Sequence, residues 1–339
     1  SGFVNYWDVP ILASDCVTLK SKDEDKYLTK FLYYALRLIQ SDIYLLQKGS
    51  DQPHVYASDI QYIKVPAVSV PIQKKALAEA HAIEKEIETI ESSIKKNGEI
   101  IDDVFNREFR FAMDEFNRTK QAKRFSANYR TLSNNADLRF SAKFHRNSGN
   151  FVMQELMNRT DKKIKHYLAE PIVLGASVSP SDYSDDGEFC YISMATIKNW
   201  KFDLESASTV SKEYSDSKQA KTVRKNDIIL ARSGEGTIGK VALIDDDELQ
   251  GVFADFTMRI RLKDYNPEFA YYYFRTTYFQ YLIEIYKKGL GNNTNIFPIV
   301  VREFPMLDIS LEEQQRIVDK IHAEIAKQAY SSSFHFQRI

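Results

Sequence analysis

The clearest hydrophobic pattern in the chain is a run of isoleucines and one valine at alternating four- and three-residue steps. This spacing puts the apolar side chains on one stripe of an α-helix, as at the a and d positions of a coiled coil. We predict a single helix from Ile72 to Phe116, a segment without proline. Asn97 takes one polar seam position, and Gly98 is expected to loosen the helix locally. The alternative is an amphipathic helix packed on its own globule. The predicted seam is Ile83, Ile87, Ile90, Ile94, Ile101 and Val104.

A second helix with the same spacing is predicted near the end of the sequence. Ser310 followed by Glu313 forms a capping-box pattern, which marks a helix start. Ile317, Ile321 and Ile325 continue the seam, and the pattern ends near Tyr330. Two such helices in one chain are each other's expected partners, so we predict an antiparallel coiled coil. Residues 331–339 are expected to form a frayed tail.

The chain also resembles itself when it is shifted by about 240 positions, which indicates a duplicated domain. Each copy predicts a strand, an aromatic helix, a glycine-containing loop, a short strand ending in proline, and then a long helix. The first copy lacks a counterpart of residues 137–243. Among the aligned positions, Gln73 falls on Gln314 and His81 on His322. The matching segments are 13–19 with 254–260, 31–34 with 271–274, 47–49 with 287–289, 63–66 with 302–305, and 69–82 with 310–323.

A glycine-rich motif from Gly234 to Lys240 satisfies the G-x-G-x-x-G pattern and most of the phosphate-binding G-x-x-x-x-G-K-[ST] pattern. Both patterns require a strand before the loop and a helix after it, because the helix N-terminus supplies N–H groups for the phosphate. A strand is predicted over 227–232, but residues 241–247 read as a second strand that ends in an acidic turn. Val241 also replaces the Ser or Thr that would bind Mg²⁺. We therefore predict a β-hairpin and retain a P-loop nucleotide site as a minor alternative.

Composition and charge narrow the function classes. The 339 residues are 43% hydrophobic and 27% charged, with a net charge of −1, which excludes a disordered chain and a histone-like polycation. Two distant cysteines, Cys16 and Cys190, suit a reducing cytoplasm rather than a disulfide scaffold. No apolar run is long enough to span a membrane. The start, Ser1 to Val4, has no signal pattern and is expected to be a cut or trimmed end.

Charge is nevertheless segregated along the sequence. Residues 72–116 carry seven basic and eleven acidic side chains, whereas residues 117–146 carry eight basic side chains and one acidic one. Such a basic segment is typical of a contact with a phosphate backbone or an acidic partner, and equally of a solvated linker.

Catalytic and metal-binding patterns are missing from the sequence. There is no methyltransferase Asn-Pro-Pro-aromatic motif and no His-Glu-x-x-His, and the six histidines form no ligand-spaced pair. The acidic run 245–247 is better explained as a hairpin turn than as a cation site. We therefore expect no enzyme activity, no cofactor and no metal, and a chain that binds and positions other molecules.

The same glycine-rich loop suits DNA, because glycines allow close backbone approach to phosphates. Arg232 and Lys240 flank it with positive charge, and Thr237 offers a hydroxyl donor. Arg259 and Arg261, two apart on one predicted strand, share a face. A second loop, 287–295, combines lysines with asparagines, whose amides pair with adenine edges. Its alternative reading is an ordinary polar loop.

The ordered series of motifs resembles the specificity (S) subunits of type I restriction-modification systems. The residues that carry the resemblance are 225–232, 236–242, Asn295-Ile296, 304–307 and 313–318, after an opening of Tyr183, Gly187, Tyr191 and Ile192. The resemblance implies a mixed α+β fold, with α/β target-recognition domains separated by spacer helices. The expected divisions are 1–66, the end of a first recognition domain; 67–117, a spacer helix; 118–308, a complete second domain; 309–330, a second spacer helix; and 331–339, the tail.

The resemblance also implies partners: double-stranded DNA, adenine-specific methyltransferase subunits and a restriction subunit, with no membrane. On this basis Arg232, Thr237, Lys240, Asn292, Asn293 and Asn295 are predicted to face DNA, and Lys221 and Arg224 to contact phosphates. The missing half of the first copy leaves three forms open: a fragment, a trimmed fusion, or a half-subunit that pairs with a second copy. A coiled-coil adaptor that binds protein is the alternative function.

Overall fold

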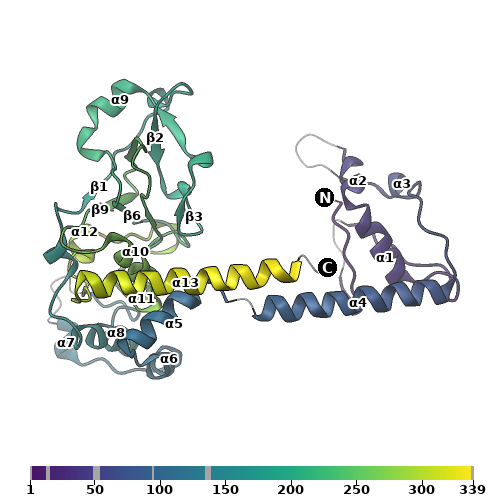
Figure 1. Ribbon diagram of the computed structural model, residues 1–339, viewed down its shortest axis with the longest axis horizontal. Helices are drawn as coiled ribbons and strands as arrows, with labels where there is room; N and C mark the ends of the chain where they lie inside the picture. Colours follow the sequence, from purple (N-terminus) through teal and green to yellow (C-terminus); the bar gives the residue numbers. More distant parts are fainter. Residues whose placement is uncertain (1, 13–15, 49–53, 94, 134–138, 337–339) are drawn as a thin grey trace. The chain divides into compact units, whose positions relative to one another are not determined.

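The chain forms two separate units in a computed structural model, which describes residues 2–12, 16–48, 54–93, 95–133 and 139–336. The first unit comprises residues 1–94 and the second residues 95–339. Helices and β-sheets occur together in the second unit, so the predicted mixed α+β class is confirmed (Figure 1). Within these ranges, no helix is long and apolar enough to cross a membrane.

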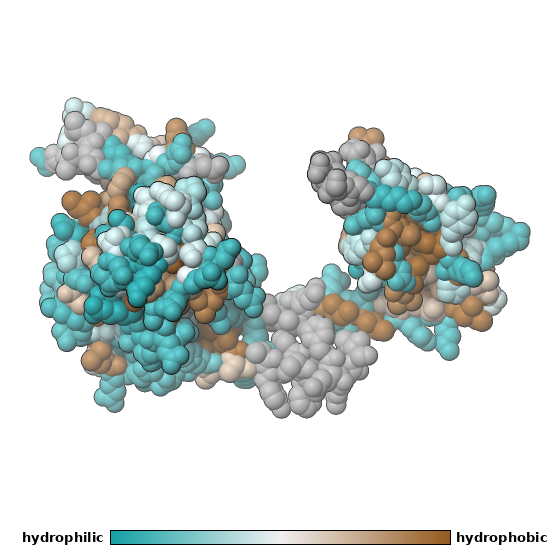
Figure 2. Space-filling view, turned by 90° about the horizontal axis from the view of Figure 1, so that it is seen from above, coloured by the Kyte–Doolittle hydropathy of each residue, from teal (hydrophilic) through white to brown (hydrophobic). Residues whose placement is uncertain are grey.

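The first unit is helical and has a small core. Its helices are α1 (Thr29–Leu38), α2 (Gln40–Leu45), α3 (Ala57–Ile60) and α4 (Val70–Ser93). Leu36, Ile43 and Val55 form the buried centre. Many other apolar side chains of this unit are exposed, among them Trp7 and Leu38, and Figure 2 shows such side chains gathered on one face.

The second unit places three small sheets beside a set of helices. Its helices are α5 (Asn97–Phe109), α6 (Met113–Gln121), α7 (Tyr129–Ser133), α8 (Asn147–Met157), α9 (Lys212–Ser217), α10 (Pro267–Arg275), α11 (Thr277–Tyr286), α12 (Pro298–Val301) and α13 (Leu311–Phe336). Its strands are β1 (Val173–Leu174), β2 (Phe189–Ile192), β3 (Ile197–Lys198), β4 (Lys201–Phe202), β5 (Ser208–Val210), β6 (Ile228–Ala231), β7 (Val241–Leu243), β8 (Gly251–Phe253) and β9 (Thr257–Ile260).

The strands form sheets with the orders β1-β9-β6-β7, β5-β2-β8 and β3-β4. The first is antiparallel throughout, and β2 pairs with β8 in parallel. All four residues of β6 are buried, as expected for an apolar run in the centre of a sheet. Helix α10 packs on β7 and also on α5 and α13, so one core joins the sheet to the helices.

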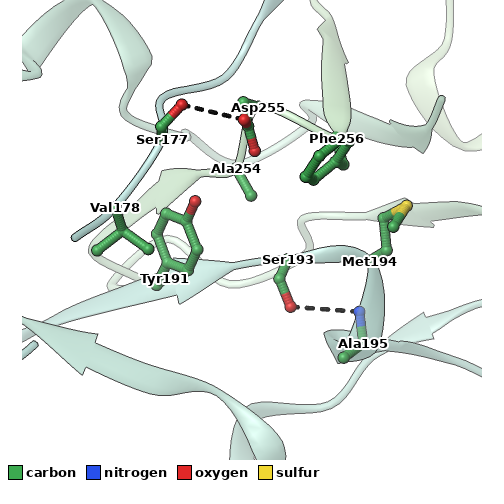
Figure 3. A pocket seen from close by; sticks show the side chains of 9 residues that line it. All are labelled: Ser177, Val178, Tyr191, Ser193, Met194, Ala195, Ala254, Asp255 and Phe256. Carbon is green, nitrogen blue, oxygen red and sulfur yellow. Dashed lines mark hydrogen bonds between the residues drawn. The ribbon is translucent and has the colours of Figure 1, made fainter. Parts of the chain in front are cut away.

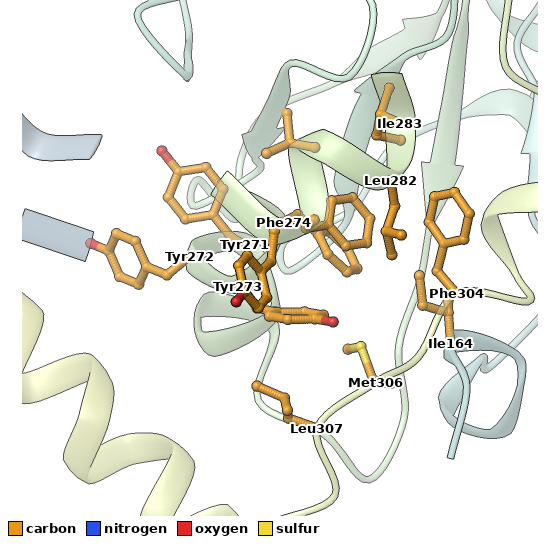
Figure 4. Close-up of a cluster of buried hydrophobic side chains, with 14 of the residues drawn as sticks. Ile164, Tyr271, Tyr272, Tyr273, Phe274, Leu282, Ile283, Phe304, Met306 and Leu307 are labelled. Carbon is orange, nitrogen blue, oxygen red and sulfur yellow. The ribbon is translucent and has the colours of Figure 1, made fainter. Parts of the chain in front are cut away.

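That core is built around the aromatic helix predicted at 271–274, which is α10. Tyr271, Tyr272, Tyr273 and Phe274 are all buried, and Figure 4 shows them among apolar side chains from other elements. The hydroxyl of Tyr273 donates a 2.9 Å hydrogen bond to the carbonyl of Pro305. A buried tyrosine needs such a partner, because an unsatisfied hydroxyl in the core costs free energy.

The predicted duplication is confirmed in the internal geometry of the two units. Gln73 and Gln314 are both buried. In each unit the side-chain oxygen of this glutamine accepts a 2.8 Å hydrogen bond from a backbone N–H just before the aromatic helix. The donor is Leu28 in the first unit and Asn266 in the second. The side-chain nitrogen of the same glutamine donates a 2.8 Å hydrogen bond to the backbone carbonyl five residues earlier in each unit. The order of the following helices is also the same, α1 to α4 and α10 to α13.

The predicted strand of the first copy is not formed, however. Residues 16–19 are irregular, while 13–15 lie outside the described residues. In the second unit the equivalent strand, β9, lies between β1 and β6. The described part of the first unit contains no strand to play these roles, and an isolated strand leaves its backbone groups unpaired. The short strands predicted before proline are also absent, apart from a single bridge between Lys163 and Pro305.

The prediction of one helix from Ile72 to Phe116 is wrong, because the segment forms three helices. Helix α4 ends at Ser93, and α5 begins after Lys96, whose backbone is extended. Asn and Gly are poor residues for a helix interior and are well accommodated near its start, so Asn97 and Gly98 open α5. A second break lies at Arg110, which adopts the left-handed conformation with φ 52°.

The predicted seam is formed where α5 pairs with α13. Ile101, Val104, Ile317 and Ile321 are buried, and Ile325 is half-buried. Ion pairs join Arg107 with Glu324, and Glu108 with Arg316 and Lys320. The later residue of α5 thus pairs with the earlier residues of α13. The two helices are therefore antiparallel, as predicted.

The rest of the seam lies in the first unit. On α4, Ile83 is 43% exposed and Ile87 is half-buried. The side chain of Ile90 and all of Ile94 lie outside the described residues. Pairing of α4 with α13 stays a prediction.

Two domain limits also differ from the predicted ones. Residues 95–117, predicted as part of a spacer, belong to the second unit, where Phe105 and Phe116 are buried in its main core. Helix α13 continues to Phe336, six residues beyond the predicted end at Tyr330.

Glu108 makes the α5–α13 pairing sensitive to acid. Its carboxylate accepts hydrogen bonds of 2.6 Å from both Arg316 and Lys320, and they lower its pKa from 4.5 to about 2. A carboxyl group with a lowered pKa in the folded chain stabilises the fold above its unfolded pKa and loses that contribution as the pH falls. Between pH 4.5 and about pH 2, Glu108→Gln should therefore flatten the loss of unfolding free energy of the second unit. Glu248→Gln, at an exposed position, is the control. Parallel curves for wild type and Glu108→Gln would contradict this role.

Candidate nucleic-acid interface

The glycine-rich motif forms the turn of a β-hairpin, as predicted. Strands β6 and β7 pair antiparallel, with Leu230 opposite Val241, so a strand follows the loop where a nucleotide site needs a helix. Gly234, Gly236 and Gly239 have positive φ angles, which residues with side chains rarely adopt. These features exclude the P-loop alternative.

The second predicted loop, 287–295, lies beside this hairpin. Asn295 forms bridges with Lys288 in its own loop and with Ser233 in the hairpin. The N–H of Gly234 donates to the carbonyl of Thr294 at 3.2 Å. The sequence indicated both loops separately, and the fold brings them together at one end of β6.

Arg232 lies at the junction of the two loops. Its Nε donates to the backbone carbonyl of Asp255 at 2.8 Å, and Nη1 donates to Oδ1 of Asn295 at 3.0 Å. The guanidinium carbon is 5.7 Å from the centre of the Phe256 ring. These contacts hold the guanidinium plane in one orientation. Within the described ranges Nη2 donates no hydrogen bond, so it is available to an external acceptor.

The other predicted DNA-facing residues have different surroundings. The hydroxyl of Thr237 donates to the carbonyl of Ser233 at 2.7 Å, so it stabilises the turn. Lys240 is half-buried at the end of the hairpin, and Asn293 is exposed. The side chain of Asn292 lies outside the described part of the structure.

Lys221 and Arg224, the predicted phosphate contacts, lie before the start of β6, whereas the two loops meet beyond its end. Arg224 is exposed. The ammonium of Lys221 donates to the carbonyl of Leu174 at 2.7 Å, and burial, followed by repulsion from Arg259, lowers its pKa. Lys221 is thus already used inside the unit.

Arg259 and Arg261 share a face, as the strand period predicts, but that face points into the protein. The carboxylate of Asp227, which is buried, accepts two 2.7 Å hydrogen bonds from Arg261. Arg259 is 5% exposed and pairs with Glu170. Their suggested role at DNA is therefore wrong: Arg261 satisfies the buried carboxylate of Asp227, and Arg259 is itself buried and paired with Glu170. Spacing defines a shared face, but it does not say whether that face is covered.

A cavity of about 370 Å³ opens next to Arg232, and no sequence pattern indicated it. Its lining includes Asp255 and Phe256 from the turn between β8 and β9, Tyr191 from β2, and Met194 just after β2 (Figure 3). Only Phe256 among these is largely exposed, at 48%. The lining comes from three short segments, around residues 177, 193 and 255, that are far apart in the sequence and form no motif, so no spacing could have predicted this site.

The basic segment 117–146 is partly packed and partly exposed. Arg139 donates to the carbonyls of Tyr286 and Lys287, and Lys143 pairs with Glu284. Its other six basic side chains are exposed, namely Arg118, Lys120, Lys123, Arg124, Arg130 and Arg146. In the described residues, no group of three or more His, Cys, Asp or Glu side chains is arranged to hold a metal ion.

The arrangement of a duplicated fold, a paired helix and converging polar loops agrees with a comparison of the sequence with protein families. Residues 1–99 and 172–329 match the model of the type I restriction modification DNA specificity domain. The chain belongs to this family. As a type I specificity subunit, it is a DNA-recognition protein and not an enzyme. No curated protein matches its sequence.

Solved structures of type I systems resemble this specificity subunit at low identity. One is described as the structural basis of complex assembly and conformational transition of the type I R-M system. Its identity to this chain is 13% and the TM-score is 0.47. The aligned part covers 93% of this chain and 68% of the chain in that structure. The S subunit from M. genitalium has 15% identity and a TM-score of 0.39, with coverages of 92% and 70%. The HsdS subunit from Thermoanaerobacter tengcongensis has 13% identity and a TM-score of 0.33, with coverages of 89% and 64%.

Proposed function

We propose that the second unit reads one half of a bipartite duplex DNA target with the surface formed by the hairpin turn 232–240 and the loop 288–295. The observation that carries this proposal is the contact of Arg232 with Asn295, which joins the two loops at one end of β6. Arginine and asparagine are side chains that read guanine and adenine edges in the major groove. A fixed guanidinium loses little conformational entropy on binding, which favours specific recognition.

Phosphate contacts would hold the reader in register on the duplex. Lys240 at the hairpin end and the exposed Arg224 are the cations proposed for this role. Thr237 acts by shaping the turn. Asn292 and Asn293 remain proposed base contacts, and Lys221 is proposed to act through the fold.

The chemistry belongs to partner subunits in this proposal. Adenine-specific methyltransferase subunits modify the DNA, a restriction subunit cleaves it, and the specificity subunit sets where they act. Spacer helices would fix the separation of two readers, because rigid elements preserve distance and rotation along the double helix. The adaptor alternative has no support in the family match, which is to a DNA specificity domain.

The test is selection from a random duplex pool by the specificity subunit reconstituted with its methyltransferase, followed by salt titration of the enriched site. The log of the binding constant should fall linearly with log salt. Lys240→Gln and Arg224→Gln should each reduce the slope by about 0.9, because each removes one phosphate contact. Lys85→Gln, exposed on α4 in the first unit, is the control. A pool without enrichment would disprove the proposal, whereas unchanged slopes would disprove the two phosphate contacts.

A further inference from the structure

The cavity beside Arg232 is lined by apolar side chains, two serine hydroxyls and one carboxylate. Phe256, Met194 and Tyr191 are among the apolar and aromatic side chains that line it. The hydroxyl of Tyr191 is directed elsewhere, because it donates to the carbonyl of Ala176 at 2.8 Å. Asp255 brings a carboxylate to the same space (Figure 3).

One oxygen of that carboxylate is held and the other is available. Ser177 donates to Oδ2 of Asp255 at 3.0 Å, which orients the group. Asp255 is half-buried, and its Oδ1 accepts no hydrogen bond from the described residues. A carboxylate is an acceptor with no donor of its own, so this oxygen selects a hydrogen-bond donor. The surrounding apolar side chains strengthen the selection, because a mismatched acceptor would leave both groups unpaired away from water.

The cavity is continuous with the proposed reading surface. Arg232 donates to the backbone carbonyl of Asp255 and lies against Phe256. Met194, which also lines the cavity, has its Sδ 3.8 Å from the hydroxyl of Thr237 in the hairpin turn. A base edge that reaches Arg232 would therefore lie beside the opening of the cavity.

We propose that this cavity receives the edge of a DNA base that carries an exocyclic amino group, cytosine or adenine, with Asp255 accepting the amino hydrogen. Phe256 and Met194 would pack against the base edge. Thymine O4 and guanine O6 are acceptors in the major groove and would be repelled by the carboxylate. This inference rests on the proposed function and adds to it the residue that sets one position of the target.

The protein-side test compares wild type with Asp255→Asn in the same duplex selection. Asparagine keeps the shape and can still accept from Ser177, but its amide also offers donors, so it no longer rejects acceptors. One base pair of the enriched motif should lose its preference, and binding to the wild-type site should weaken about tenfold to a hundredfold. Asp216→Asn, which removes the same charge from an exposed position on α9, should leave the motif unchanged.

The outcomes separate this inference from the function on which it rests. If wild type enriches no motif, the proposed function fails. If wild type enriches a motif and Asp255→Asn enriches the same one, the function stands and the inference is overturned.

A DNA-side test needs no altered protein, so a variant that fails to fold cannot obscure it. Cytosines or adenines of the enriched site are replaced singly by N4-methylcytosine or N6-methyladenine, whose methyl group takes the place of the amino hydrogen that base pairing leaves in the major groove. Wild type should lose about tenfold or more in affinity when one particular cytosine or adenine of the site carries the methyl group. Whether the affinity falls at a methylated cytosine or at a methylated adenine identifies the base that the cavity receives. If no single methylated position weakens binding, the inference is overturned.

Discussion

Replacing Asp227 with alanine is expected to lower the free energy of unfolding of the second unit by about 3–5 kcal/mol, because it leaves a buried charge without its partner. The side chain of Asp227 is 1% exposed and that of Arg261 is 15% exposed. Their two parallel hydrogen bonds, both 2.7 Å, are the strong bidentate kind. Asp227 also accepts the N–H of Arg224 at 2.8 Å, which ties down the turn before β6. Glu170 also contacts Arg261, but its side chain is 35% exposed, so it cannot take the place of Asp227 as the buried partner of Arg261.

Urea unfolding measured by Trp200 fluorescence in a Trp7→Phe background checks this expectation, because Trp200 is then the remaining tryptophan and lies in the second unit. Asp216→Ala, at an exposed position, is the control for loss of an acidic side chain. The double variant Asp227→Ala with Arg261→Met should recover much of the loss, since it removes both charges. A loss below about 1 kcal/mol for Asp227→Ala, similar to that of a surface pair, would contradict the buried network.

Phe105→Ala is expected to destabilise the second unit by about 3–5 kcal/mol, the usual cost of removing a buried aromatic side chain. Phe105 is 1% exposed, and its ring centre is 5.3 Å from that of Phe269 and 6.1 Å from that of Tyr273. Removing the ring leaves a cavity between α5 and α10 that the surrounding core can fill only in part.

The same Trp200 fluorescence measurement reports this loss. Phe140→Ala, where the ring is 69% exposed, serves as the matched control and should change stability by no more than about 0.5 kcal/mol. The comparison also tests the domain boundary. If α5 were an independent spacer, Phe105→Ala would leave the unfolding transition of the second unit where it is in wild type.

Local patterns in the sequence predicted the features that depend on near neighbours in the chain. The hairpin was predictable because residues 227–232 and 241–247 read as two strands around a glycine turn, and β6 and β7 formed there. The duplication was predictable because each copy keeps the same order of helices, and the matched positions Gln73 and Gln314 make the same hydrogen bonds.

Patterns of side-chain spacing were less informative about what covers a surface. Ile83 and Ile101 belong to one run of spacing in the sequence, yet Ile83 is exposed and Ile101 is fully buried. Arg259 and Arg261 looked like a charged surface and are instead bound to Glu170 and Asp227. In both cases the outcome depended on residues more than 30 positions away.

By itself, the sequence determined the repeated order of helices and the hairpin, since these follow from short-range periodicity and turn residues. Its ordered motifs indicated the family, and through that resemblance the mixed fold class. The tertiary structure alone decided which charges are buried, and that Arg232, Asn295 and Asp255 meet at one surface. The physical reason is that burial and pairing are set by contacts between distant segments. Backbone propensity and periodicity act over a few residues and carry no information about those contacts.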